Sequence, residues 1–369
     1  DPGGAAPRLR APHALVHVNP ARHAGPASDL HDLLLLGHQG LVDLGDVLVG
    51  RLLHLVGLAL LVVLADGALL LQLLQEVEAV AADDETRKVA LRLHDGDVVE
   101  TVLMRYPTRD DGTGAERATV CVSTQVGCPV KCSFCATGLM GFTRNLSTAE
   151  IVGQALHFLR WSRANPPVVR NVVFMGMGEP LMNYDATMGA VALLVDGAGL
   201  GVHRLTVSTS GWLPGMARLI DDQYAVRLAV SLHAPVDDLR SSLVPLNRRF
   251  PLAILLDACW EYQARTRRRV TFEYTLLDGV NDTPALARDL VRLCRGRDVH
   301  VNLIPMNPVA SLPFGASRPE AVDEFHAILR GAGVICTIRR EMGREIRAAC
   351  GQLRTEVQGR SRTAVDAVP

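Results

Sequence analysis

Residues 118–135 read ATVCVSTQVGCPVKCSFC, and this stretch decides which fold the sequence predicts. Its first third, Ala118–Ser123, is rich in valine and threonine and is expected to form a strand. Three cysteines follow closely: Cys128, Cys132 and Cys135. Because α/β barrels carry their chemistry at the carboxyl ends of their strands, a cysteine cluster directly after a strand predicts a site of that kind.

Beyond this stretch, short β-rich segments alternate with longer helical patterns. The clearest helix follows Ser147, since Ser147 and Glu150 have the spacing of a capping box and apolar residues follow them. Six β/α units imply a parallel sheet covered by helices, so we expect an α/β fold, a partial (βα)6 TIM-type barrel. The six expected strands are Ala118–Ser123, Val169–Met175, Arg204–Thr209, Ala225–Leu232, Val270–Leu276 and Val299–Ile304.

The amino-terminal side adds a smaller β unit. Thr86–Leu93 and Val98–Tyr106 are expected to pair as a hairpin, because the turn sequence His-Asp-Gly-Asp lies between them. Residues 1–80 contain no Phe, Tyr or Trp and are interpreted either as a leucine-rich helical cap or as the product of an incorrect reading frame. We therefore expect four regions: an N-terminal accessory segment (1–80), a β-hairpin extension (81–113), the barrel core (114–347) and a C-terminal segment (348–369).

Composition excludes several classes of protein. With 369 residues, of which 48% are hydrophobic, the chain is neither a disulfide-held mini-protein nor a disordered one. Four of its eight cysteines are clustered, and no secretory signal is recognisable, so we predict a reducing, cytoplasmic setting. The apolar stretch Leu52–Leu74 is interrupted by Asp66 and Gly67, and no membrane span is expected. Three cysteines without a motif are interpreted as core residues: Cys259, Cys294 and Cys336.

The spacing of the clustered cysteines indicates a metal centre. Three thiolates separated by four and three residues can converge on a cubane iron–sulfur cluster, whose fourth iron then stays open to another molecule. The alternative is a structural zinc site completed by Cys121 or a histidine. No second CxxC or HxxxH pair lies near these cysteines to complete it, so the iron–sulfur interpretation is favoured.

The motif Cys128-x-x-x-Cys132-x-Phe134-Cys135 resembles the hallmark of the radical S-adenosylmethionine superfamily. Further motifs narrow the resemblance to the RlmN family of dual-specificity RNA methyltransferases, over about residues 86 to 355. These motifs are Cys121–Cys128, Gly141–Leu146, Met175–Leu181, Ser208–Gly211, Ser231–Pro235, Asn302–Pro308 and Ala349–Leu353.

The resemblance implies an enzyme that methylates C2 of one adenosine in 23S rRNA and of the adenosine beside the anticodon in tRNAs. That carbon is electron-poor, so a polar attack on a sulfonium methyl is excluded and a radical route is required, with the cofactor supplying the hard chemistry. The family implies one 4Fe-4S cluster per chain and two molecules of S-adenosyl-L-methionine consumed per methylation. It also implies a monomer that receives electrons from a protein such as flavodoxin or ferredoxin.

The same resemblance assigns roles to individual residues. Cys128, Cys132 and Cys135 would hold the cluster. Cys350 would carry the methyl group, Cys121 would resolve the intermediate through a transient Cys121–Cys350 disulfide, and Glu100 would accept a proton. From their local sequence alone, Cys350 is an inert buried thiol and Glu100 a solvent-facing charge on a hairpin. The expected cofactor contacts are Gly178, Glu179, Ser210, Ser231, Leu232, His233 and Asn307.

Two basic segments are candidate contacts to RNA phosphates: Arg265–Arg269 and Arg339–Arg340. The family also uses an N-terminal helical accessory domain for RNA, and residues 1–80 lack its pattern. Two alternatives stay open. One is a Cfr-like enzyme that methylates C8 of the same rRNA adenosine. The other is a catalytically silent RNA-binding homologue, which is disfavoured because the three cluster cysteines, Cys121 and Cys350 are all present.

Overall fold

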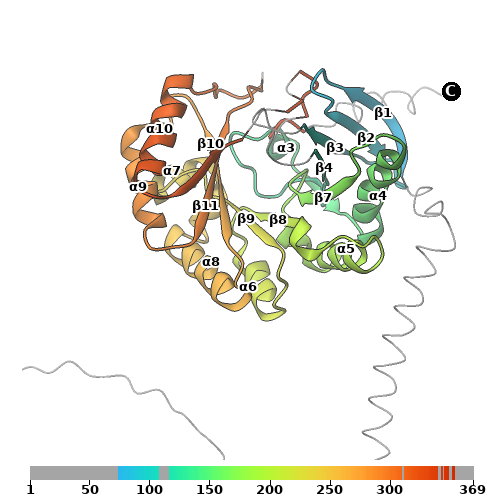
Figure 1. The fold of residues 1–369 in the computed structure, drawn as a ribbon, viewed down its shortest axis with the longest axis horizontal. Helices are drawn as coiled ribbons and strands as arrows, with labels where there is room; N and C mark the ends of the chain where they lie inside the picture. The colour runs from blue at the N-terminus through green and yellow to red at the C-terminus, as the bar shows by residue number, and fades with distance from the viewer. Residues whose placement is uncertain are drawn as a thin grey trace, which may run out of the picture. The chain divides into compact units, whose positions relative to one another are not determined.

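One sheet of ten strands organises the protein in the computed structural model, which describes residues 74–107, 116–309, 311–339, 342–343, 345–348 and 351–353 (Figure 1). Each strand of this sheet is hydrogen-bonded to the next in chain order. They are β1 (Gln75–Ala81), β2 (Arg87–Arg92), β3 (Val98–Tyr106), β4 (Arg117–Cys121), β7 (Val169–Phe174), β8 (Leu205–Thr209), β9 (Arg227–Ser231), β10 (Val270–Leu276), β11 (Val299–Pro305) and β12 (Ile335–Ile338).

Strands β4 to β12 of this sheet are all parallel, which confirms the predicted partial barrel. Six β/α units are followed by β12, an additional strand that the sequence did not indicate. The helices cover the outer side of the curved sheet (Figure 1). They are α4 (Thr148–Ala164), α5 (Tyr184–Asp196), α6 (Leu213–Asp221), α7 (Asp237–Leu243), α8 (Leu252–Thr266), α9 (Pro284–Cys294) and α10 (Pro319–Gly331).

Side-chain alternation along β10 shows how the barrel is built. The rings of Phe272 and Tyr274 pack against aromatic rings of α8 and α10, at centroid distances of 6.0 and 5.2 Å. Because successive side chains of a strand point to opposite faces, Glu273 and Thr275 lie on the inner face. The apolar core therefore lies between the sheet and the helices, and polar side chains such as Glu273 and Thr275 lie inside the barrel.

The amino-terminal extension has three antiparallel strands rather than the predicted two. β2 and β3 form the expected hairpin, and β3 joins the barrel by pairing antiparallel with β4. The additional strand, β1, shows that the helical interpretation of residues 1–80 is wrong for residues 75–80. Residues 76–79 read EVEA, a short alternation of polar and apolar residues that suits an edge strand, and the leucine-rich composition of the preceding segment concealed it. Residues 1–73 lie outside the described part of the chain.

A second, two-stranded sheet carries the cysteine loop. It pairs β5 (Gln125–Gly127) with β6 (Phe142–Asn145), and the loop between them includes the short helix α3 (Ala136–Leu139). α4 then begins with the predicted capping box: Ser147 Oγ accepts from the Glu150 amide at 3.3 Å, and Glu150 Oε2 accepts from the Ser147 amide at 2.8 Å. This cap fixes where the first barrel helix starts.

The other expectations about the core agree with the structure where it describes them. Cys259, Cys294 and Cys336 are buried, as predicted for residues without a motif. Among the described helices, none combines the length and apolar character required to cross a bilayer. Residues 52–73 of the apolar stretch lie outside the described ranges.

Candidate active site

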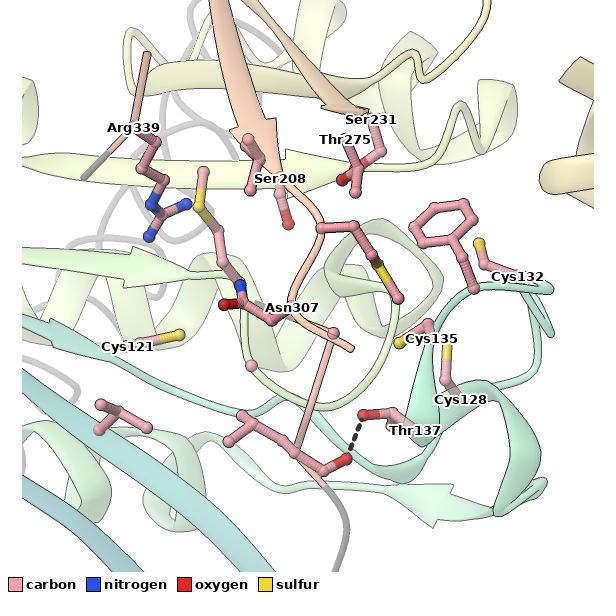
Figure 2. A pocket seen from close by; sticks show the side chains of 18 of the residues that line it. Cys121, Cys128, Cys132, Cys135, Thr137, Ser208, Ser231, Thr275, Asn307 and Arg339 are labelled. Carbon is pink, nitrogen blue, oxygen red and sulfur yellow. Dashed lines mark hydrogen bonds between the residues drawn. The ribbon is translucent and has the colours of Figure 1, made fainter. Parts of the chain in front are cut away.

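A pocket opens at the carboxyl ends of the parallel strands, where the sequence predicted the chemistry. Figure 2 shows the three clustered cysteines at one side of it and Cys121 on the opposite side. Every expected site residue that the structure describes, apart from Leu232 and Glu100, lines this pocket. These residues are Cys121, Cys128, Cys132, Cys135, Gly178, Glu179, Ser210, Ser231, His233 and Asn307.

Backbone hydrogen bonds hold the cysteine loop in place. The Cys128 amide donates to the carbonyl of Gly141 at 2.7 Å, and the Cys135 amide donates to Cys132 at 3.2 Å. At the start of α3, the Ala136 amide donates to the carbonyl of Gly351 at 2.8 Å. The loop is therefore anchored both to its own sheet and to the carboxyl-terminal segment.

Burial of the thiols in this loop makes their negatively charged form unfavourable unless a positive charge binds next to them. Burial, and next the nearby Cys135, raise the pKa of Cys128 to about 12, and burial raises the pKa of Cys132. Metal coordination deprotonates such thiols, so three sulfurs converging on one pocket fit the donor set of an iron–sulfur cluster. Among the described residues, no three Cys, His, Asp or Glu side chains are grouped closely enough to hold a single metal ion. In a cubane cluster each thiolate binds a different iron, so the three cysteines need not converge on one atom.

A glycine-rich turn after β7 lines the pocket next to the cysteine loop. Gly178 has φ +107°, and a Cβ at this position would lie 2.7 Å from the Cβ of Gln125. The next amide, that of Glu179, donates to Gln125 Oε1 at 2.8 Å. Only glycine satisfies both the backbone angle and this close approach.

The Glu179 carboxylate is buried beneath the pocket and ties two segments together. Its Oε2 accepts from the Ser210 amide at 2.6 Å and its Oε1 from the Leu181 amide at 3.2 Å. Burial raises the pKa of Glu179, and these amide donors oppose the shift. The side chains of Thr209 and Ser210 also donate to this carboxylate.

His233 is held in one orientation next to the cysteine loop. Its φ of +58° is in the left-handed region, and its Nδ1 accepts from the Thr275 amide at 3.1 Å. Its ring contacts Phe134 edge-on, with 4.7 Å between the centroids. Burial, and then the charge of Arg240, lower the pKa of His233 to about 3, so the ring is neutral. The preceding Leu232 is fully buried and contributes its side chain to the core.

Asn307 leaves an acceptor without a hydrogen-bond partner. The residue is 4% exposed and lines the pocket, and its Oδ1 has no partner among the described residues. Because buried polar atoms in folded proteins are nearly always satisfied, this oxygen indicates a position where a bound molecule donates a hydrogen bond.

The opposite side of the pocket carries Cys121, at the end of β4, and Glu100 lies on the neighbouring strand β3. Cys121 is 8% exposed at the end of β4 and lines the pocket. Glu100 is buried, and its Oε1 lies 3.0 Å from Lys88 Nζ. The interpretation of Glu100 as a solvent-facing charge is therefore wrong, because β3 is covered on both faces. Cys350 lies outside the described residues, although Ala348 and Gly351 on either side of it line the pocket.

The two basic segments differ in their surroundings. Within Arg265–Arg269, the first arginine pairs with Glu261 at 3.6 Å and the last with Asp298 at 2.7 Å. This segment precedes β10, at the amino ends of the strands and away from the pocket. Arg339, in contrast, lines the pocket, and Arg340 lies outside the described residues.

Sequence reasoning missed two residues that shape the site. Gln125 supports the glycine-rich turn, and its Nε2 also donates to Asn145 Oδ1 at 2.8 Å. Arg240 is fully buried and donates to carbonyl groups at the ends of β8 and β9. Neither belongs to a local pattern that would have indicated burial, because both positions are defined by contacts between segments distant in the sequence.

This partial barrel, with three cysteines beside a glycine-rich strand end, defines a radical S-adenosylmethionine enzyme, and the sequence model of the Radical SAM superfamily matches residues 122–290. In fold, the chain is similar to the crystal structure of a radical SAM methyltransferase from Sphaerobacter thermophilus. The two share 53% sequence identity with a TM-score of 0.73, over 77% of this chain and 82% of that one.

Curated relatives narrow the class. The dual-specificity RNA methyltransferase RlmN 1 of Myxococcus xanthus is 49% identical, over 80% of each chain. The probable RlmN of Frankia alni is 50% identical, over 80% of this chain and 71% of its own. The chain belongs to the RlmN family of radical SAM methyltransferases. The family uses a 4Fe-4S cluster and S-adenosylmethionine, which agrees with the donor set of the pocket.

Proposed function

We propose that this protein methylates C2 of one adenosine in 23S rRNA and of the adenosine beside the anticodon in tRNAs. The observation that carries the proposal is the arrangement of one pocket, in which the three clustered cysteines face Cys121 across the expected cofactor residues. The RlmN relatives named as dual-specificity RNA methyltransferases support the same substrates.

In this proposal the pocket holds both cofactors. Cys128, Cys132 and Cys135 bind a 4Fe-4S cluster, and an electron-donor protein such as flavodoxin or ferredoxin reduces it. When bound, the cluster supplies the electron that cleaves S-adenosylmethionine homolytically. Glu179 accepts from the cofactor's ammonium group, and the Asn307 acceptor described above takes a second donor. The expected contacts of Gly178, Ser210, Ser231, Leu232 and His233 complete this set, partly through their backbone groups.

Two cysteines carry the methyl group through the reaction. The Cys350 thiolate would accept a methyl group from one S-adenosylmethionine. One hydrogen atom of that methyl group would pass to the deoxyadenosyl fragment of a second S-adenosylmethionine, the carbon would bond to C2 of adenine, and the remaining unpaired electron would return to the cluster. Cys121 next attacks the Cys350 sulfur: a sulfur–sulfur bond forms, and the carbon–sulfur bond breaks with its electron pair left on carbon. That carbon takes a proton and becomes the methyl group, and a cellular thiol supplies two electrons that restore both cysteines.

Removal of the C2 proton needs a base, and Glu100 is proposed for that role. It occupies the same face of β3 as Val102 and Met104, because residues two apart in a strand share a face, and both of those line the pocket. Glu100 Oε1 forms an ion pair with Lys88 Nζ at 3.0 Å. A buried carboxylate on the strand next to Cys121 would take the proton directly or through that thiol.

RNA binding is proposed to involve Arg339 close to the reacting base. Its guanidinium points into the pocket from the end of β12 (Figure 2). An arginine in this place can donate to a phosphate of the target nucleotide, which positions the base without reading its sequence. The arginines of the 265–269 segment, which lie at the opposite ends of the strands, are proposed as more distant phosphate contacts.

The deciding experiment is methylation of RNA by the full chain after anaerobic reconstitution with iron and sulfide. Unmodified 23S rRNA fragments and tRNAs are the substrates, and digested nucleosides are analysed by mass spectrometry. 2-Methyladenosine is the expected product. 8-Methyladenosine alone would replace the proposal with the Cfr-like activity, and an iron-free protein that does not cleave S-adenosylmethionine would support the silent homologue.

The two-cysteine chemistry has a separate test. Cys121→Ala is expected to accumulate a covalent RNA–protein adduct, because the thioether at Cys350 can no longer be resolved. Cys350→Ala is expected to keep its iron and form no adduct. Cys259→Ala, which changes a cysteine buried in the core, is the matched control and should form no adduct and turn over normally. Absence of an adduct in Cys121→Ala under turnover would exclude Cys121 as the resolving residue.

A further inference from the structure

Arg240, in the middle of α7, is fully buried and surrounded by oxygen acceptors. Its Nε donates to the Leu232 carbonyl at 3.0 Å, and its Nη2 donates to the carbonyls of Ser210 at 2.8 Å and Ser231 at 3.0 Å. Its Nη1 donates to Asn247 Oδ1 at 2.7 Å. Four hydrogen bonds from one guanidinium thus fix the ends of two adjacent strands.

Three of these four acceptors, the carbonyls of Ser210, Ser231 and Leu232, belong to the expected cofactor contacts. The peptide group of Ser210 is held from both sides, since its amide donates to Glu179 and its carbonyl accepts from Arg240. Ser231 and Leu232 directly precede His233, whose backbone adopts the left-handed conformation. Arg240 therefore supports the backbone of three of the seven expected cofactor contacts, those at the ends of β8 and β9.

The same helix also holds the cysteine loop. The carbonyl of Leu243, the last residue of α7, accepts from the Ser133 amide at 3.0 Å. Ser133 lies between Cys132 and Cys135, so α7 is bonded at one point to the cysteine loop and at another to the ends of β8 and β9. This short helix therefore links the cysteine loop to the strand ends that would hold the cofactor.

Among the described residues, the hydrogen bonds of Arg240 go to neutral acceptors and not to a carboxylate. Burial lowers the pKa of Arg240 to about 10, whereas Cys132, Cys259 and Asp237 favour its charged form. Cys132 and Arg240 each favour the charged form of the other. A buried cation is costly unless nearby anions compensate it.

We propose that Arg240 is a positioning residue that aligns the cofactor-binding strand ends with the cysteine loop, and that its buried charge stabilises the reduced form of the cluster. The inference rests on the proposed function, because it assumes that the cluster and S-adenosylmethionine occupy this pocket. Reduction adds one negative charge to the cluster, and a fixed guanidinium nearby lowers the free energy of that state.

Two substitutions separate the hydrogen bonds from the charge. Arg240→Lys keeps the charge but has a shorter reach and no planar fork, whereas Arg240→Met removes both. Arg249→Met is the matched control, because Arg249 is exposed and stacks on Trp212 and Phe250 without touching the strand ends. The full chain is loaded with its cluster in each case. Iron content, thermal unfolding, midpoint potential and equilibrium dialysis of S-adenosylmethionine are measured.

Arg240→Lys is expected to weaken S-adenosylmethionine binding by about tenfold and leave the potential close to that of the unmodified protein. Arg240→Met is expected to weaken binding at least as much and to shift the potential to more negative values, by about 59 mV for each tenfold loss in stability of the reduced state. The control should change neither quantity.

The outcomes separate this inference from the proposed function. An unmodified protein that assembles no cluster contradicts the proposed function. A loaded protein whose Arg240→Lys variant binds S-adenosylmethionine with unchanged affinity overturns the positioning role, even if Arg240→Met fails to fold. An unchanged potential in a folded, loaded Arg240→Met variant overturns the electrostatic role.

Discussion

The two ends of the parallel strands differ in how their charged side chains are stabilised. At the carboxyl ends, Glu179 and Arg240 are buried, but backbone amides and carbonyls satisfy them. At the amino ends, arginines of neighbouring strands gather without such partners. They are Arg117 at the start of β4, Arg204 just before β8, Arg227 at the start of β9 and Arg268 just before β10.

The arginines of the amino ends repel one another. Burial lowers the pKa of Arg227, and the neighbouring Arg204, Arg268 and Arg117 lower it further. In the part of the chain described, none of the four forms an ion pair with a carboxylate. Solvent screens these exposed and half-exposed charges. The difference indicates that the carboxyl end is organised before any ligand arrives, whereas the amino end has no comparable constraint on geometry.

The largest effect is expected where the carboxyl end meets the metal. Cys132→Ser should remove one cluster ligand, so iron content should fall sharply and methyl transfer should drop to background. Cys259→Ser is the matched change in the core. It should lower the free energy of unfolding by about 1–2 kcal/mol, because it buries a hydroxyl group, and it should leave the iron content unchanged. Iron analysis and unfolding of both variants check this contrast, which an iron-replete Cys132→Ser protein would contradict.

A smaller effect is expected from the glycine-rich turn. Gly178→Ala places a methyl group 2.7 Å from the Gln125 side chain in a backbone conformation that alanine resists. We expect a loss of about 1–3 kcal/mol in the free energy of unfolding, together with weaker S-adenosylmethionine binding, because Glu179 is displaced.

Gly96→Ala is the control for this change. Gly96 also has positive φ, at +90°, but no atom outside its own neighbourhood lies within 4 Å of the added Cβ. Gly96→Ala should lower the free energy of unfolding by about 1 kcal/mol, from backbone strain alone, and should leave cofactor binding unchanged. Equal binding defects in the two variants would show that the turn at Gly178 has no special part in holding the cofactor.

His233 gives the carboxyl end a pH dependence of known sign. Its pKa is about 3 in the folded protein and 6.5 ordinarily, so the unfolded chain takes up a proton first and stability falls as the pH drops below about 6.5. His233→Asn removes this titration with a residue that tolerates positive φ. Relative to the variant, the unmodified protein should lose about 1 kcal/mol between pH 7 and pH 5.5, measured by urea unfolding. Parallel stability curves would contradict the shift.

The sequence predicted the carboxyl end better than the rest because its signals are local. Cysteine spacing, the glycine-rich turn and β-rich runs are each contained in a few consecutive residues, and the predicted strand Val169–Met175 differs from β7 by one residue. Edge strands gave weaker signals: β12 has only four residues, three of them exposed, and no strong apolar pattern.

Burial of charge could not be predicted from local sequence. Glu100 follows a hairpin turn and has the pattern of an exposed residue, yet β3 lies between β2 and β4 with both faces covered. Arg240 lies in a short polar helix, and its burial depends on carbonyls at the ends of β8 and β9, which lie 8, 9 and 30 residues earlier in the chain. Such positions are set by tertiary packing, which a single sequence does not encode as a pattern.

The smallest effect is expected at the amino ends. Arg227→Gln removes one of four mutually repelling charges, so the melting temperature should rise by about 1 °C at low salt, and the gain should vanish at high salt as screening removes the repulsion. Arg218→Gln, which removes a guanidinium bonded to Asp185, should give no such gain. Iron content and S-adenosylmethionine binding should stay unchanged in both variants. A lower melting temperature for Arg227→Gln at low salt would mean that this arginine has an attractive partner, and the contrast between the two ends would then fail.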